Sequence, residues 1–289
     1  MDFANLKTFI SVAENGSFSA ASEQLFLTQP AISKRIAALE EELNTELFDR
    51  IGRQVSLTES GQALLPRARQ ILLDVDDSRR AIKNLSDDVS GALSIGTSHH
   101  IGLHRLPPIL RAYTKQYPDV ELDIHFMDSE QACRAVEHGE LEMGIVTLPL
   151  SPAPALQTQT IWPDPLSVIV GKDHPLHHCK KPTLQQLAEH KAVLPARGTF
   201  TREIIEHAFE QHQLDVNISL STNYLETIKM LVSVGLGWSV LPMTMIDKDL
   251  QQINMKEFSL TRELGVVQHA KRTQSNAGKA LISLLQKKA

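Results

Sequence analysis

The chain has 289 residues, of which 42% are hydrophobic, and a formal net charge of −5 at pH 7. This length fits two or three compact units, and the composition argues against wholesale disorder. No basic stretch followed by an apolar run opens the sequence, so we expect no signal peptide. The most apolar stretch, 230–243, is broken by polar residues and is too short to span a bilayer. These features predict a cytoplasmic protein.

The first forty-three residues predict three helices. The first carries apolar residues at helical spacing on one face, Leu6, Phe9, Ile10 and Ala13, and Gly16 ends it. Ser17 or Ser19 can cap a short second helix. Thr28 can cap the third, and Pro30 lies in its first turn, where a missing N–H donor costs nothing.

The third helix has two chemically different faces. Its inner face is apolar and consists of Ile32, Ile36, Leu39 and Leu43. Its opposite face carries Gln29, Ser33, Lys34 and Ala37 near the N-terminal end. Such a face can enter the major groove of DNA, where Gln pairs with adenine, Lys with guanine, and Ala or Ser meets a thymine methyl. The competing interpretation is a small helical domain whose polar face meets only water.

A basic hairpin is predicted next, over 47–57. Gly52 permits the turn, and Arg50 and Arg53 can reach a phosphate or the minor groove. Residues 1–60 carry five bases against nine acids, so any DNA contact must depend on the local placement of a few bases. The order of elements, two short helices, a capped helix with a polar end and a basic hairpin, favours a winged helix-turn-helix.

This stretch resembles the N-terminal domain of LysR-type transcriptional regulators. The similar segments are FISVAENGSFSAA at 9–21, LTQPAISKRI at 27–36, LFDR at 47–50 and LTESG at 57–61. Looser similarity continues through Pro118, 139–145, 174–176 and 235–242. Together with the residue patterns, the resemblance implies that double-stranded promoter DNA is contacted by Ser17, Ser19, Thr28, Gln29, Pro30, Ser33, Lys34, Arg35, Arg50 and Arg53.

A long helix is expected at 59–90, capped by Thr58. Its seam alternates spacings of four and three and consists of Leu64, Ala68, Ile71, Val75, Ser78, Ile82, Leu85 and Val89. A coiled coil of about four heptads would produce this pattern, although a single helix packed on its own domain would also fit. The resemblance implies a homodimer through this helix and assembly to a homotetramer.

From residue 91 onward, strands alternate with helices, which is typical of an α/β architecture. We predict strands at 92–96, 120–126, 143–147, 166–170, 192–194, 218–221, 238–241 and 264–269. The resemblance implies two α/β subdomains, like those of a periplasmic binding protein, with chain crossings near Ile161 and Gly265. The expected divisions are a DNA-binding domain at 1–58, the linker helix at 59–90 and an effector-binding domain at 91–289. Subdomain I takes about 91–161 and 266–289, and subdomain II about 162–265.

Ligands of such sheets bind beyond the carboxyl ends of strands and on helix N-termini. Hydroxyl, amide and imidazole groups follow several predicted strands, and the resulting candidates are Thr97, Ser98, His99, Thr147, Gly198, Thr199, Phe200 and Asn223. The resemblance also implies an effector in this cleft, contacted by Thr97, Ser98, Thr147 and Thr199. Hydroxyls and free amides favour a small polar metabolite, such as a carboxylate. Any one of these residues could instead be a simple helix cap.

Other functions leave weaker signals. No nucleophile elbow, phosphate loop or HExxH motif is present, so we expect no enzyme, although the binding-protein fold can host catalysis. A thiol-redox regulator using Cys133 or Cys179 is a second alternative. His174, His177 and His178 are interpreted as solvated rather than as metal ligands. We expect no metal and no cofactor. The favoured function is a sequence-specific DNA-binding transcription regulator controlled by a small effector.

Overall fold

A computed structural model describes the chain except for residues 52–53, 180–181, 256–257 and 289. The chain forms two compact units, 1–86 and 87–289. Across the described residues, no helix combines the length and the apolarity that crossing a membrane requires.

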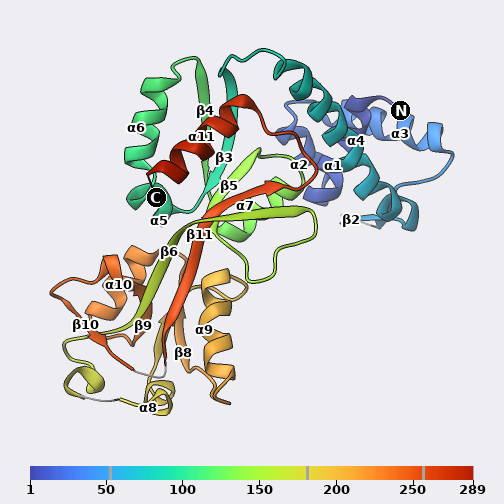
Figure 1. The fold of residues 1–289 in the computed structure, drawn as a ribbon. Helices are drawn as coiled ribbons and strands as arrows, with labels where there is room; N and C mark the ends of the chain where they lie inside the picture. Colours follow the sequence, from blue (N-terminus) through green and yellow to red (C-terminus); the bar gives the residue numbers. More distant parts are fainter. Residues whose placement is uncertain (52–53, 180–181, 256–257, 289) are drawn as a thin grey trace. The chain divides into compact units, whose positions relative to one another are not determined.

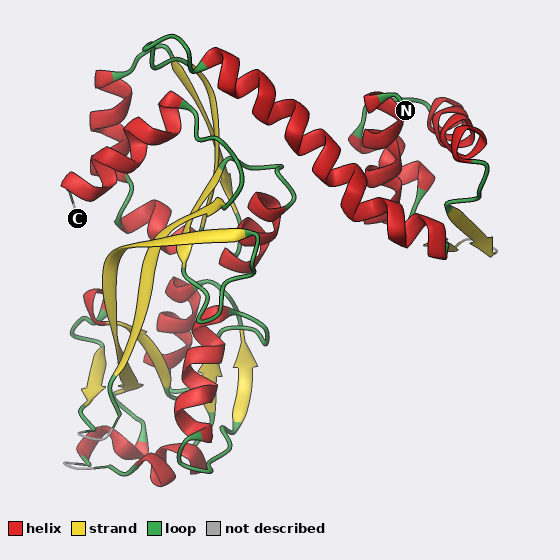
Figure 2. Ribbon diagram, turned by 45° about the vertical axis from the view of Figure 1, so that its right-hand side comes forward, coloured by secondary structure: helices red, strands yellow, loops and turns green. Residues whose placement is uncertain are grey.

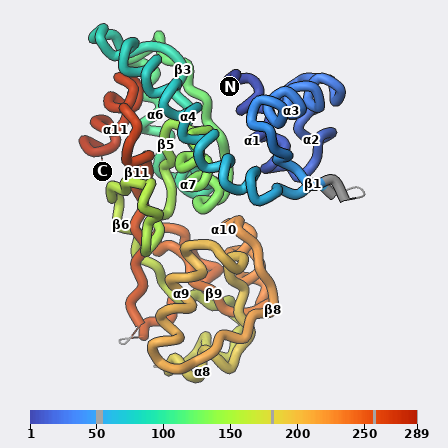
Figure 3. Tube along the Cα trace, turned by 90° about the vertical axis from the view of Figure 1, so that its right-hand side faces the viewer, coloured from blue at the N-terminus to red at the C-terminus, as the bar shows by residue number. Residues whose placement is uncertain are grey.

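The first unit begins with helices α1 (Phe3–Asn15), α2 (Phe18–Gln24) and α3 (Gln29–Leu43), which cluster together in Figure 3. The predicted wing is confirmed, because β1 (Phe48–Ile51) pairs antiparallel with β2 (Gln54–Leu57). Apolar residues from all of these elements form one core, which includes Phe9, Ile36 and Phe48. The helix boundaries follow from local chemistry, since Ser17 and Thr28 cap α2 and α3 and Gly16 ends α1 at φ +58°.

Helix α4 (Glu59–Lys83) is capped by Thr58 as predicted, but the prediction of its seam is partly wrong. The helix ends before Leu85 and Val89, so the seam cannot run four heptads along it. Its first half faces its own domain, because Ala68 is buried in the core of the first unit and Leu64 and Ile71 pack against that core. An apolar stripe on a helix can pack against its own domain or against a partner helix. Here residues 64–71 pack against the core of their own domain.

Subdomain I of the second unit is a three-layer α/β structure. Strands β3 (Gly91–Thr97), β4 (Val120–Phe126) and β5 (Met143–Thr147) are parallel, with β3 in the middle. Helices α5 (His99–His104), α6 (Pro107–Gln116) and α11 (Asn276–Lys287) share one apolar core with the sheet. Helix α7 (Ser129–Glu137) contributes to a separate core.

Subdomain II follows the same plan. Strand β7 (Ala192–Leu194) pairs parallel with β8 (Ile218–Ser221), and β9 (Ser239–Pro242) and β10 (Leu250–Ile253) pair antiparallel with β6 (Leu156–Gly171). Helices α8 (Leu184–Glu189) and α9 (Phe200–Glu210) and the 3₁₀ turn η1 (Pro175–His178) belong to one core. Helix α10 (Leu225–Ser233) and the turn η2 (Met243–Met245) belong to another.

Two long strands, β6 (Leu156–Gly171) and β11 (Leu260–His269), carry the chain between the subdomains (Figure 2). They pair antiparallel along ten residues of β11, with a register shift at Leu264/Gly265. Trp162 and Leu264 belong to the core of subdomain I, whereas Leu166 and Leu260 belong to that of subdomain II. A Cβ at Gly265 would lie 2.1 Å from the Gln159 carbonyl oxygen, so only glycine fits at this bend.

The strand predictions succeed best where a strand is short and bounded by turns. Strands β4, β5, β7 and β8 have the predicted bounds, and β3 and β9 differ from them by one residue at each end. The sequence predicted only residues 166–170 of β6 and 264–269 of β11, and it missed β10. The missed part of β6 contains prolines, and its partner residues on β11 lie about a hundred residues away.

Candidate DNA-binding and effector sites

The exposed end of α3 carries most of the predicted DNA contacts. Thr28 accepts a hydrogen bond from the Ala31 amide at 3.4 Å. Gln29, Pro30 and Lys34 are exposed and Ser33 is half-buried, while Ile32 is fully buried in the core. The first two turns of α3 therefore present these side chains as one surface.

The remaining predicted DNA contacts are less uniform. Ser17 caps α2, with its hydroxyl accepting from the Ala20 amide at 3.3 Å, and Ser19 is exposed. Arg35 is half-buried and donates to the Thr8 hydroxyl of α1 at 3.4 Å, so part of its function is to hold α3 on α1. Arg50 lies on β1, and Arg53 is outside the described residues.

Part of the acid excess of the first unit lies away from this surface. Glu41 and Glu42 lie in the last turn of α3, ~18 Å along the helix axis from Gln29. That is about twice the screening length at physiological ionic strength. The Glu40 carboxylate accepts a hydrogen bond from the Leu47 amide at 2.8 Å and so ties α3 to the segment before the wing. These three acids therefore do not prevent the N-terminal end of α3 from approaching a phosphate backbone.

A pocket lies in the second unit between the two subdomains. Its lining residues are Ser98, His99, His100, Asp128, Ser129, Glu130, Thr147, Pro195, Thr199, Thr201, Asn223, Leu225 and Arg262. The cavity is about 60 Å³, which holds a few water molecules. A ligand with more than a few heavy atoms would extend beyond this cavity unless the subdomains separate.

Five of the predicted effector residues line this pocket: Ser98, His99, Thr147, Thr199 and Asn223. Ser98 follows β3 and caps α5, while Thr147 ends β5. Thr199 caps α9 and also donates to the Ala196 carbonyl at 2.9 Å. These positions are strand ends and helix starts, as the rule for open α/β sheets predicts.

The other three predicted residues do not line it. Thr97 is fully buried, and its hydroxyl donates to the Ile145 carbonyl at 2.8 Å, so its side chain faces β5 rather than the cleft. Gly198 allows the backbone φ of +83° before α9. Phe200 packs against the core that contains α7. The side chains of Thr97 and Phe200 are therefore engaged elsewhere in the fold, and Gly198 has no side chain to offer a ligand.

Sequence reading missed the start of α7. Asp128 and Ser129 follow β4 in the same way that Ser98 follows β3, so the same rule would have found them. Asp128 forms a capping box with Gln131, and its carboxylate accepts the Asn223 side-chain amide at 2.6 Å. The Asn223 side-chain oxygen in turn accepts the Ala196 amide at 2.8 Å.

The carboxylate of Glu130, a residue of α7, lies at the N-terminus of α9. It accepts the Phe200 amide at 2.5 Å. Burial raises the pKa of Glu130, while the hydrogen bond from Phe200 works in the opposite direction. Since α7 belongs to subdomain I and α9 to subdomain II, Glu130 and Asp128 hold the cleft together with hydrogen bonds from the chain itself.

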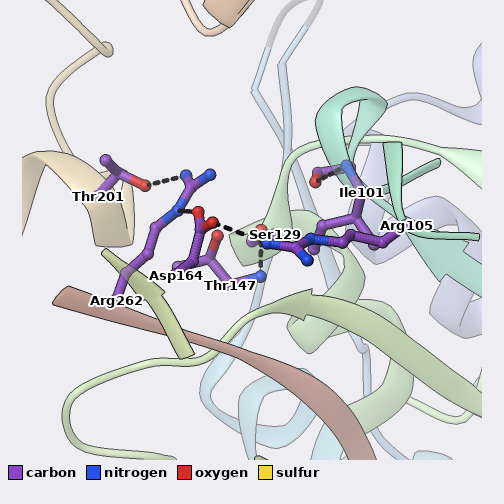
Figure 4. A network of polar contacts seen from close by, with 8 residues as sticks. Ile101, Arg105, Ser129, Thr147, Asp164, Thr201 and Arg262 are labelled. Atoms are coloured by element: carbon purple, nitrogen blue, oxygen red, sulfur yellow. Dashed lines mark hydrogen bonds and ion pairs between the residues drawn. The ribbon is translucent and has the colours of Figure 1, made fainter. Parts of the chain in front are cut away.

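A buried charge network supports one wall of the pocket (Figure 4). Arg262 of β11 donates Nε to Asp164 at 2.8 Å and Nη1 to the Thr201 hydroxyl at 3.0 Å. Arg105 of subdomain I donates to the other oxygen of Asp164 at 3.2 Å. Burial lowers the pKa of Arg262, while Asp164 opposes that effect.

The Nη2 atom of Arg262 is buried and has no hydrogen-bond partner among the described residues. Arg262 is itself among the residues that line the pocket. Sequence reading missed Arg262 because the strand prediction began two residues later.

Buried histidines were also missed. His100 lies on α5 and lines the pocket with only 5% of its surface exposed. Burial lowers the pKa of His100 to about 4, so the ring is neutral at pH 7. His174, interpreted from the sequence as solvated, is instead buried and caps η1 through Nδ1.

The fold and these two surfaces define a class: a helix-turn-helix protein with a binding-protein-like sensor domain. Two family models match the chain. Residues 3–62 match the bacterial regulatory helix-turn-helix protein of the lysR family, and residues 86–289 match the LysR substrate binding domain. The chain belongs to the LysR family of transcriptional regulators, in which a DNA-binding domain is joined to an effector-binding domain.

Individual relatives agree with this assignment. An uncharacterised HTH-type transcriptional regulator of Azotobacter vinelandii is 67% identical over 108 residues, which are 37% of this chain and 75% of that protein. A probable RuBisCO transcriptional regulator of Synechocystis is 30% identical over 288 residues, which cover 96% of this chain and 83% of that one. The crystal structure of full-length CbnR in complex with its target DNA covers 100% of both chains with a TM-score of 0.62 at 23% identity.

Proposed function

We propose that this regulator reads its operator with the exposed end of α3 and holds the DNA backbone with the β1–β2 wing. Gln29, Ser33 and Lys34 are the base-reading candidates, and Arg50 and Arg53 are the backbone contacts. The observation that carries this proposal is the two-sided α3, whose inner face is the domain core and whose N-terminal outer face is polar and exposed. CbnR, whose structure includes target DNA, provides a precedent for the fold. Such a regulator acts in the cytoplasm, where the promoter is.

The test compares Lys34→Ala with Lys7→Ala, an exposed lysine on α1. Lys34→Ala should lose roughly 1–3 kcal/mol of discrimination between the operator and a scrambled duplex if it reads a base. Arg53→Ala should weaken both duplexes alike and flatten the salt dependence of binding. Lys7→Ala should bind like the parent. Parent-like binding by both Lys34→Ala and Arg53→Ala, with normal unfolding curves, would refute this assignment.

We infer that the effector is a small polar metabolite with a carboxylate, held between the subdomains. The Nη2 of Arg262 and the hydroxyls of Ser98 and Thr201 suit an anion, and Thr199 lines the same pocket. Asp128 and Glu130 bring negative charge to the same pocket. A molecule that also carries an ammonium group therefore fits better than a dianion. Its carboxylate would compete with Glu130 for the α9 N-terminus, which links binding to opening of the cleft.

A thermal-shift screen of metabolites identifies the effector, because specific binding raises stability by mass action. The decisive variant is Thr199→Leu, and the matched control is Thr183→Leu, which removes an N-cap threonine from α8 outside the pocket. Both should lose about 0.5–2 kcal/mol of stability with the cap. Only Thr199→Leu should lose effector affinity in calorimetry. Full affinity in that variant would place the effector elsewhere.

Self-association through α4 belongs to the same proposal. Ile82 is 70% exposed on this helix, in the half of the seam that the N-terminal core leaves uncovered. A pair of such helices would bury this half of the seam in a homodimer, and two dimers would form the expected tetramer. Effector binding would then change the relative orientation of the two dimers and the distance between their DNA-reading helices. No catalytic turnover is part of this function.

A further inference from the structure

Three side chains with metal-binding atoms meet at the cleft. His100 and His104 lie on α5, and Glu226 lies in the first turn of α10, helices that Figure 1 labels. One ligand atom from each residue lies within 4.8 Å of the other two. The spacing of four puts both imidazoles on one face of α5, with ring centroids 4.8 Å apart. His104 Nε2 and Glu226 Oε1 are 3.1 Å apart.

His100 gives a second, independent sign of a missing partner. Its side chain is buried, and neither ring nitrogen has a hydrogen-bond partner in the described part of the chain. A buried polar group without a hydrogen-bond partner destabilises the folded state. A cation bound to one ring nitrogen would remove that destabilisation. The ion pair between His104 and Glu226 does not supply a partner for His100.

The ligand set selects the kind of metal. Two imidazoles and one carboxylate form a set that zinc enzymes use, with further positions open to water or to another ligand. In a tetrahedral zinc site the ligand atoms lie ~3.4 Å apart, so the side chains need to move by about 1 Å from their present positions. Imidazole ligands favour Zn²⁺, Ni²⁺ or Cu²⁺ over Mg²⁺ and Ca²⁺.

We propose that His100, His104 and Glu226 bind a divalent transition metal, with Zn²⁺ the best match to the ligand set, and that this metal bridges the two subdomains at the effector pocket. Helix α5 belongs to subdomain I and α10 to subdomain II, so the metal would hold the cleft at one separation. His100 also lines the pocket, which places the metal beside the bound effector. Metal binding and effector binding would then be coupled reciprocally. The site itself does not depend on the effector assignment.

The experiment titrates the chelator-treated full-length chain with Zn²⁺, in competition with a chromophoric chelator and without effector. The parent should bind about one equivalent per chain. His104→Ala and Glu226→Gln should each weaken binding at least about tenfold, since even loss of a supporting outer residue has that effect. Both side chains are about half exposed, so these variants should fold. The control is His125→Ala, which breaks an exposed pair with Asp123. No third metal-binding side chain joins that pair within the part of the chain that the structure describes.

Cobalt adds a readout of geometry, because tetrahedral Co²⁺ absorbs visible light far more strongly than octahedral Co²⁺. The parent and His125→Ala should give the intense spectrum, and His104→Ala should not. Zn²⁺ should also raise the unfolding temperature of the parent and not that of Glu226→Gln. A parent that binds no metal, or a His104→Ala chain that binds one equivalent as tightly as the parent, would overturn the proposal. Neither result would affect the effector assignment, which is tested by calorimetry with its own variants.

Discussion

Burial changes the chemistry of single histidines in this protein. His174 is 7% exposed, and its Nδ1 accepts the Leu176 amide at 3.1 Å. Burial, with a smaller contribution from nearby His190, lowers the pKa of His174 from 6.5 to about 4. Between these two values the unfolded chain binds more protons than the folded one. The contribution of His174 to stability is therefore complete above about pH 6.5 and is lost as the pH falls toward 4.

His174→Asn tests this pH dependence. The asparagine oxygen can accept the same Leu176 amide, but asparagine does not titrate. The fall in urea midpoint between pH 7.5 and pH 5 should be smaller in this variant than in the parent. Some fall should remain, because the pKa of His100 is lowered in the same way. The exposed His125→Asn should behave like the parent, and an unchanged fall in His174→Asn would contradict the prediction.

At the scale of elements, the wing is docked on α4 through a glycine. A Cβ at Gly61 would lie 2.2 Å from the Leu47 carbonyl oxygen and 2.8 Å from Cδ2 of Leu57. The same carbonyl accepts the Thr58 amide at 3.1 Å, so it cannot simply turn away. Gly61→Ala should therefore destabilise the N-terminal unit by roughly 1–3 kcal/mol, despite the better helix propensity of alanine. Thermal unfolding measures the loss. Gln62→Ala, exposed one residue later, is the control and should leave the melting temperature nearly unchanged.

The two halves of α4 predict different outcomes for two seam substitutions. Ile71 packs against the core of the N-terminal unit, so an aspartate there should unfold that unit. Ile82 is exposed in the single chain, so Ile82→Asp should leave the fold intact and dissociate the oligomer. Sedimentation velocity distinguishes the two. Lys83→Asp, on the outer face of the helix, is the matched control, and an intact oligomer in Ile82→Asp would mean that α4 does not pair through this seam.

At the scale of the whole molecule, the two thiols lie in different cores. Cys133 belongs to the core around α7 and Cys179 packs on the core of subdomain II, and both are free. Burial, followed by the negative charge of Glu130, raises the pKa of Cys133 to about 12. At pH 8 only ~1 in 10,000 of this thiol is ionised, and the thiolate is the reactive form. A redox switch through Cys133 is therefore disfavoured.

An aromatic disulfide reagent at pH 8 measures this difference. In the native chain Cys179, which is partly accessible, should react, and Cys133 should react only after urea is added. A Cys179→Ser chain should release no chromophore until it unfolds. Prompt reaction of that variant in native buffer would revive the redox alternative for Cys133.

Sequence alone determined the features that depend on nearby residues. The caps at Ser17, Thr28 and Thr58, the β1–β2 hairpin and the short strands β4, β5, β7 and β8 follow from side-chain chemistry within a few positions. Five of the eight candidate effector residues line the pocket, because strand ends and helix starts can be recognised locally.

Only the tertiary structure decided the rest, because it depends on pairings between distant segments. Thr97 and Ser98 are adjacent and both carry hydroxyls, yet strand geometry turns one toward β5 and the other into the pocket. Arg262 reaches the pocket only because β11 pairs with β6 about a hundred residues away, where Asp164 neutralises it. The burial of His100 and its approach to Glu226 likewise require two subdomains to meet. Side-chain periodicity specifies which face of an element is apolar, but not which neighbour covers that face.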